Sequence, residues 1–193
     1  MKKSFNADIS KWVTSSVVNM GGVFTGASSF NSDLSKWKTS SVTTMSHLFS
    51  NAHAFNSDIT KWMTSRVTEM NHMFYKARVF NHDLNKWVTS SATTMRGTFY
   101  GASMFNGNIS TWDTSFVTSM KGTFYGASSF NSDLSRWVLS KVVNMEEMFL
   151  LAIVFNNDAA LSWDTSSATN MNSMFAHAYK FNSDISKFNT EKV

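Results

Sequence analysis

Apolar and polar positions along this chain repeat with a period of 25 residues. Each period opens with a motif close to Phe-Asn-x-Asp-(Ile/Leu)-Ser-x-Trp, and its second half places apolar residues three and four positions apart. The repeats start at Phe5, Phe30, Phe55, Phe80, Phe105, Phe130, Phe155 and Phe181. Self-similarity of this kind indicates a solenoid, in which each repeat packs only against its neighbours.

One repeat, Phe30–Ala54, shows which elements the pattern predicts. From Val42 onward the apolar residues follow a helical spacing, and Thr39–Ser41 supply hydroxyl groups of the kind that cap helices. The segment Asp33–Trp37 has room only for a short strand. We therefore predict an α/β solenoid, a leucine-rich-repeat-like stack of about 7.5 coils, each coil a short strand plus a short helix. The pattern leaves open whether Val17–Met20 and its equivalents are strand or helix.

The same periodicity predicts internal columns of side chains. The tryptophans that recur in step are Trp12, Trp37, Trp62, Trp87, Trp112, Trp137 and Trp163, and Phe188 holds the eighth position. The recurring methionines are Met20, Met45, Met70, Met95, Met120, Met145 and Met171. The methionines occupy a repeat position that belongs to the apolar set, so we expect them to pack in the core rather than to bind copper.

The whole chain, residues 1–193, reads as a single repeat domain. Phe155 to Trp163 is one residue longer than the equivalent segments, and we expect a bulge within Asp158–Leu161. The chain begins and ends in mid-repeat, which favours a fragment of a longer chain. A targeting signal or anchor could lie outside it.

Composition narrows the possible functions. The chain has no cysteine, so it can have neither disulfides nor zinc–thiolate sites. A net charge of +4, spread along the chain, lacks the concentrated basic footprint of a nucleic-acid binder. The longest apolar run, Met148–Phe155, is far shorter than the roughly 20 residues of a membrane span.

Two segments carry a resemblance to a known family. They are WMTSRVTEMNHMFYKARVFNHDLNK, Trp62–Lys86, and WDTSSATNMNSMFAHAYKFNSDIS, Trp163–Ser186. Both resemble the surface-protein repeat of the BspA-like leucine-rich-repeat group, and the resemblance covers nearly the whole chain. It implies a leucine-rich-repeat-like solenoid in a cell-surface or secreted protein that mediates contacts, and it provides no catalytic residues to carry over.

An asparagine follows the first phenylalanine of every repeat, and we expect these side chains to form a ladder that satisfies backbone groups. The asparagines are Asn6, Asn31, Asn56, Asn81, Asn106, Asn131, Asn156 and Asn182. The alternative is calcium, because each asparagine and the aspartate two residues later offer oxygen ligands. The glycines that calcium-binding repeats need are absent, so we predict no cofactor and no metal.

Charges also recur in step. Asp8, Asp33, Asp58, Asp83, Asp133 and Asp184 each precede a cation by three residues, namely Lys11, Lys36, Lys61, Lys86, Arg136 and Lys187. Where the aspartate becomes Asn108, the cation becomes Thr111, which suggests mutual neutralisation in a solvated ladder of exposed pairs. The alternative is an anion-binding basic stripe.

The clearest departure from the repeat is a run of large apolar residues at repeat positions that hold small or polar residues in other repeats. Tyrosines and apolar residues stand at the same positions of neighbouring repeats. Together these residues predict a partner-binding patch. The residues of this patch are Leu150, Leu151, Ile153, Val154, Tyr75, Tyr100, Tyr125, Val79 and Met104.

These features favour a non-catalytic scaffold that binds another protein, at a cell surface or secreted. The first alternative is a subunit of a large intracellular or organellar assembly. A second alternative is a glycan-binding module, which would require exposed tryptophans. We predict that the chain is not an enzyme, because no nucleophile–base constellation is visible. The sequence does not predict the oligomeric state.

Overall fold

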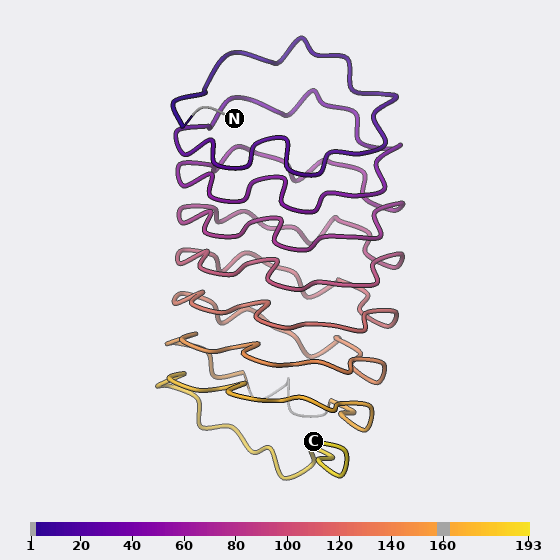
Figure 1. The fold of residues 1–193 in the computed structure, drawn as a ribbon, viewed down its shortest axis with the longest axis vertical. Helices are drawn as coiled ribbons and strands as arrows, with labels where there is room; N and C mark the ends of the chain where they lie inside the picture. Colours follow the sequence, from indigo (N-terminus) through magenta and orange to yellow (C-terminus); the bar gives the residue numbers. More distant parts are fainter. Residues whose placement is uncertain (1–2, 158–162) are drawn as a thin grey trace.

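The computed structural model describes residues 3–157 and 163–193, which wind into one stack of coils (Figure 1). The chain runs coil by coil from the indigo end of the stack to its yellow end. The bulge expected within Asp158–Leu161 lies outside the described residues.

The described coils contain no α-helix, and strand pairing among them is limited to single parallel bridges. The bridges join equivalent residues of successive coils: Asn19, Thr44, Glu69, Thr94, Ser119, Asn144 and Asn170. The prediction of an α/β, leucine-rich-repeat-like stack with a strand and a helix in each coil is therefore wrong. The structure is a solenoid built of turns, and the segment Val17–Met20 contributes one bridge residue, Asn19.

The segment that was predicted as a helix is a run of turns whose hydrogen bonds alternate between two destinations. In the second coil, the amides that donate to carbonyls of the next coil are those of Met45, His47, Phe49 and Asn51. The amides that donate three residues back within the coil are those of Leu48, Ser50 and Ala52. An α-helix would send every amide four residues back, so half of this hydrogen bonding joins neighbours rather than building a local element.

Backbone conformation explains why a helix does not form here. His47 and Asn51 have φ angles of 59° and 58°, in the left-handed region that interrupts a right-handed helix. Glycine holds the two equivalent positions of the first coil, Gly22 and Gly26, with φ angles of 68° and 73°. Successive tight turns place apolar side chains three and four residues apart, so they reproduce a helical spacing without a helix.

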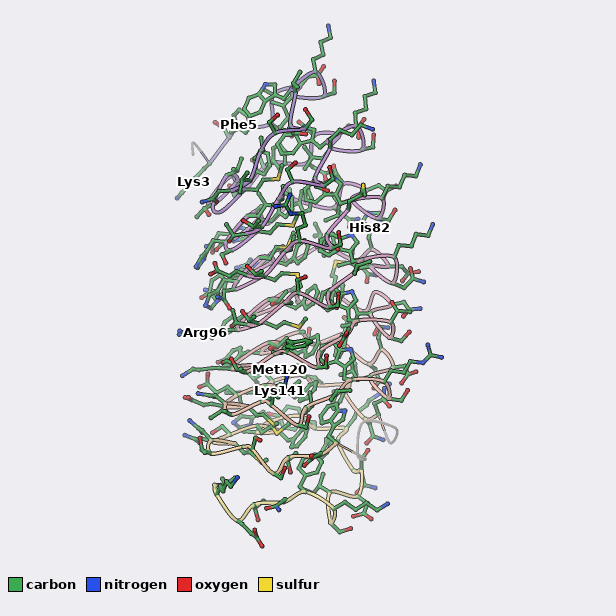
Figure 2. All side chains as sticks on the ribbon, turned by 90° about the vertical axis from the view of Figure 1, so that its right-hand side faces the viewer. Lys3, Phe5, His82, Arg96, Met120 and Lys141 are labelled. Carbon is green, nitrogen blue, oxygen red and sulfur yellow. The ribbon has the colours of Figure 1, made fainter. Side chains whose placement is uncertain are left out.

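The predicted internal columns are confirmed. Trp37, Trp62 and Trp87 are at most 5% exposed, and their rings stack with centroids 6.3 and 6.4 Å apart. The six methionines of the repeat from Met20 to Met145 are buried, whereas Met171 is only partly buried. Figure 2 shows Met120 inside the stack and Arg96 at its edge. The prediction that methionine fills the core is therefore correct for these coils.

Neighbouring coils are joined differently on the two sides of the stack. On the side formed by the run of turns, which we call the turn side, backbone amides donate directly to carbonyls of the next coil. The Phe49 amide, for example, donates to the Met73 carbonyl at 2.8 Å. On the tryptophan side, side chains mostly bridge the gap, as when the Trp62 indole N–H donates to the Leu34 carbonyl at 3.3 Å. Side-chain bridges hold the backbones further apart than a direct bond does.

Ring separations measure this difference. Across neighbouring coils, ring centroids lie 4.8 Å apart for Tyr75 and Tyr100 and 5.4 Å apart for Phe74 and Phe99. They lie 5.9 Å apart for Phe80 and Phe105, and the tryptophan column reaches 6.1 to 6.4 Å. Equivalent groups would be equally spaced if the coils were parallel, so the coils fan out from the turn side toward the tryptophan side.

A substitution at Gly26 distinguishes the run of turns from a helix. Replacing Gly26 with alanine should lower the free energy of unfolding by about 1–2 kcal/mol, because alanine disfavours a left-handed φ. No atom lies within 4 Å of an added Cβ, so the cost comes from the backbone alone. Urea denaturation measures it.

The matched control for this test is Gly26→Asn, which should cost less because Asn51 already holds the equivalent position with a positive φ. In a helix, Gly26→Ala would instead stabilise the protein by about 1 kcal/mol. A gain in stability with alanine would therefore contradict the turn assignment.

Candidate interaction surfaces

The predicted asparagine ladder is confirmed. The Asn31 carboxamide oxygen accepts the Asn56 amide at 2.8 Å, and the Asn56 carboxamide accepts the Asn81 amide at 3.0 Å. The same bond recurs along the stack, from Asn6 to Asn182. Each carboxamide oxygen accepts a backbone amide of the next coil. This hydrogen bond explains why asparagine recurs at this position of the repeat without invoking a metal ion.

The predicted aspartate–lysine pairs do not form direct ion pairs in residues 3–157 and 163–193, where Lys121 and Glu146 are the pair in contact at 2.8 Å. Most of these aspartates accept the amide two residues later instead, as Asp33 does from Ser35 at 2.8 Å. That hydrogen bond is the main reason that the pKa of Asp33 lies below its usual range, and Lys36 contributes less. Each of these carboxylates therefore mainly stabilises the turn of its own coil, by accepting this backbone hydrogen bond.

A column of buried threonines joins successive coils beside the tryptophans, and the sequence reading overlooked it. The Thr39 hydroxyl donates to the Met63 carbonyl at 3.0 Å and accepts the Met63 amide at 2.8 Å. Thr64 donates in the same way to Val88 at 2.9 Å. The signal was available in the sequence, because threonine recurs two residues after the tryptophan.

The three tyrosines of the predicted patch form one stack on the turn side of the solenoid, where the coils lie closest together. Ring centroids lie 4.8 Å apart for Tyr75 and Tyr100 and 4.1 Å apart for Tyr100 and Tyr125. Leu150 holds the next position of the row, and its carbonyl accepts the Gly126 amide. All four side chains are half-buried. Burial, and then a hydrogen bond with Tyr125, raises the pKa of Tyr100.

The remaining predicted residues follow members of this row by one to four residues along the chain. Met104 and Ile153 are exposed, at 53% and 38%, whereas Leu151, Val79 and Val154 are half-buried. We call the row of Tyr75, Tyr100, Tyr125 and Leu150, with exposed Met104 and Ile153, the tyrosine face. Ring stacking joins three of the nine predicted residues, so the patch as a whole stays a prediction.

A histidine pair lies one turn before the tyrosines. The rings of His47 and His72 stack with centroids 4.9 Å apart, and the His72 Nδ1 atom is buried without a hydrogen-bond partner. Gly97 follows in the same row, where a Cβ would collide with the His72 ring. Burial, assisted by the charges of His47 and Arg96, lowers the pKa of His72 from 6.5 to about 4.

No three His, Asp or Glu side chains of residues 3–157 and 163–193 gather in a way that could hold a metal ion. None of the same residues form a helix of the length and hydrophobicity that crossing a bilayer demands.

Stacked coils, internal columns and ladders of equivalent side chains define the chain as a solenoid repeat protein. A family model described as Mycoplasma protein of unknown function, DUF285, matches residues 1–108, 78–161 and 158–193. The matches together cover the chain, which belongs to this family. Searches of curated proteins and of solved structures found no match. The family match agrees with a repeat protein and does not confirm a BspA-like leucine-rich-repeat relationship.

The low pKa of His72 makes stability depend on pH. Unfolded histidine takes up a proton near pH 6.5, whereas folded His72 resists protonation down to about pH 4. The stabilisation is therefore present above pH 6.5 and declines as pH falls toward 4. We expect a loss of about 2 kcal/mol of unfolding free energy between pH 7 and pH 5.

His72→Asn should remove most of this dependence, because asparagine tolerates the left-handed φ of 54° and has no proton to gain. The matched control is His177→Asn, which also has a positive φ but lies at an exposed position. Urea denaturation at each pH measures the effect. An equally steep pH dependence in His72→Asn and wild type would contradict the assignment.

Proposed function

We propose that this chain is a non-catalytic repeat scaffold that binds another protein through the tyrosine face. The observation that carries the proposal is the half-buried stack of Tyr75, Tyr100 and Tyr125, which continues into Leu150 and is flanked by exposed Met104. Tyrosine and methionine are enriched in protein interfaces, and an ordered stack loses little side-chain entropy on binding.

The position of the tyrosine face supports the same proposal. It lies on the side where the coils are closest, and a solenoid curves toward that side. The surface on that side is therefore the concave one, and concave solenoid surfaces commonly bind extended partners. Charges of both signs lie at the face, because the Lys76 ammonium is 5.1 Å from the centre of the Tyr75 ring and the charge of Glu147 contributes to the raised pKa of Tyr100. The partner that fits best is a protein with an apolar strip.

The glycan-binding alternative loses its physical basis, because it required exposed tryptophan rings. The described indoles from Trp37 to Trp163 are at most 5% exposed, and only Trp12 in the first coil reaches 53%. We therefore do not propose a glycan-binding function.

Replacing Leu150 and Ile153 together by serine should weaken partner binding at least tenfold, because it removes the apolar end of the tyrosine face. The fold should survive, since Ser50 occupies the row of Leu150 and Ser128 that of Ile153. Quantitative affinity capture identifies proteins that the wild type retains and the double variant loses, and titration of the purified partner gives both affinities.

The control for this test is Val138→Asp, which changes an exposed apolar residue on the tryptophan side, where Asp113 already occupies the equivalent position. It should leave the captured proteins unchanged. Capture that is equal for wild type and the double serine variant would contradict the proposed function.

We propose that binding takes place at the cell surface, as the resemblance to surface-protein repeats suggests. The alternative is a subunit of an intracellular assembly. Protease treatment of intact cells that carry the parent protein should then remove epitopes of this repeat domain, while a cytoplasmic marker stays intact. Protection of the domain until the cells are lysed would favour the intracellular alternative.

A further inference from the structure

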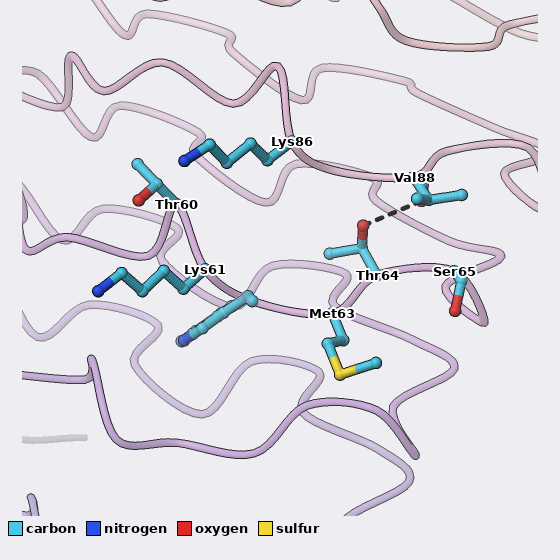
Figure 3. A pocket seen from close by; sticks show the side chains of 8 residues that line it. Thr60, Lys61, Met63, Thr64, Ser65, Lys86 and Val88 are labelled. Atoms are coloured by element: carbon cyan, nitrogen blue, oxygen red, sulfur yellow. Dashed lines mark hydrogen bonds between the residues drawn. The ribbon is translucent and has the colours of Figure 1, made fainter.

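The tryptophan side carries a groove that the proposed function does not use. Two cavities, of about 350 and 200 Å³, lie on neighbouring coils and share Lys61 and Met63. They form one depression along the stack from Ser35 to Val88, which we call the lysine groove. Figure 3 shows Lys61 and Lys86 leaving successive coils in the same direction beside it.

The lysine groove combines positive charge with exposed apolar surface. Lys38, Lys61 and Lys86 line it, and all three side chains are exposed. Met63 and Val88 also line it and are 60% and 49% exposed. No aspartate or glutamate lines either cavity.

The nearest carboxylates on the chain do not neutralise these lysines by direct contact. Asp58 accepts the Thr60 amide at 2.9 Å, and Asp83 accepts the Asn108 amide at 2.8 Å. In the described part of the chain, neither aspartate forms an ion pair with Lys61 or Lys86. The charge of Lys61 still acts on Asp58 and helps to lower its pKa, but no carboxylate of the described residues is in direct contact with either ammonium group, which leaves their hydrogen-bond donors open to an anionic partner.

The spacing of the coils matches an extended polypeptide. Trp37 and Trp62 lie 6.3 Å apart, and Trp62 and Trp87 lie 6.4 Å apart, beneath the groove. An extended strand places alternate side chains about 6.6–6.8 Å apart on one face. A strand that lies edgewise along the stack, between the lysines and the Met63–Val88 row, would therefore point every second side chain toward one row and the intervening side chains toward the other, at the spacing of the coils.

We propose that the lysine groove binds an extended, acidic segment of a partner protein, with a carboxylate at every second residue and apolar residues between them. The carboxylates would meet the lysines of successive coils, and the apolar side chains would cover Met63 and Val88. A single-stranded nucleic acid fits less well, because such strands need open aromatic faces for base stacking. Trp37, Trp62 and Trp87 are buried.

The test uses the 193-residue chain and two fluorescent ten-residue peptides of identical composition. One alternates glutamate with valine, and the other has all five glutamates in one block. Anisotropy titration should show that the block peptide binds at least fivefold more weakly, because only the alternating peptide matches the coil spacing. A single-stranded thymidine decamer should bind more weakly than the alternating peptide.

Two variants remove the groove chemistry with residues that the repeat already tolerates. Lys61→Thr with Lys86→Thr follows Thr111, and Val88→Asp follows Asp113. Each variant should weaken binding of the alternating peptide at least fivefold, and urea denaturation should show that both remain folded. The control, Arg136→Thr with Lys187→Thr, removes two charges of the same phase outside the groove and should change affinity less than twofold.

Three results would each overturn the proposal. The first is equal affinity for the alternating and block peptides. The second is an equal loss of binding in the control and in the lysine double variant, because non-specific charge attraction would then explain the binding. The third is binding of the thymidine decamer as tight as that of the alternating peptide, which would indicate a general polyanion site. All three leave the tyrosine face untested, so failure here and failure of the proposed function are distinguishable.

Discussion

The structure depends on the alternation of backbone hydrogen bonds between two destinations. On the turn side every second amide must find a carbonyl of the next coil, as the Phe49 amide finds Met73. A coil alone would leave these groups unpaired, and unpaired buried backbone groups are costly. The chain has no proline, so no position lacks a donor. The backbone hydrogen bonds of each coil are thus completed only by a neighbouring coil, and this is why the fold is a stack.

The unequal joining of the two sides determines which surfaces can exist. Direct backbone bonds bring the coils close enough for Tyr100 and Tyr125 to stack at 4.1 Å. On the other side, the Asn56 carboxamide and the Thr64 hydroxyl bridge the coils, and ring separations reach 6.4 Å. The narrow side therefore suits a compact aromatic surface, whereas the wide side leaves room for cavities between coils.

The sequence predicted the period, the columns and the asparagine ladder, because these depend on which residues recur. It did not predict the turns. The spacing from Val42 to Ala52 fits a helix and a run of turns equally well, and the paired glycines Gly22 and Gly26 were the evidence that separates them. The pairing of Asp33 with Lys36 failed for a similar reason, since the Ser35 amide is closer to the carboxylate than any cation.

Residues that repeat in every coil cannot by themselves distinguish one partner from another, since each coil presents the same groups. Specific recognition must come from positions where the coils differ. Tyrosine replaces small residues in the row of Ser50 only in three successive coils, and the row of Met63 and Val88 differs from coil to coil, with Lys38, Asp113, Val138 and Asp164 at equivalent positions. The two sets lie on opposite sides of the stack, so a partner on one surface would leave the other accessible. A uniform scaffold thereby carries the two proposed binding surfaces at positions where its coils differ.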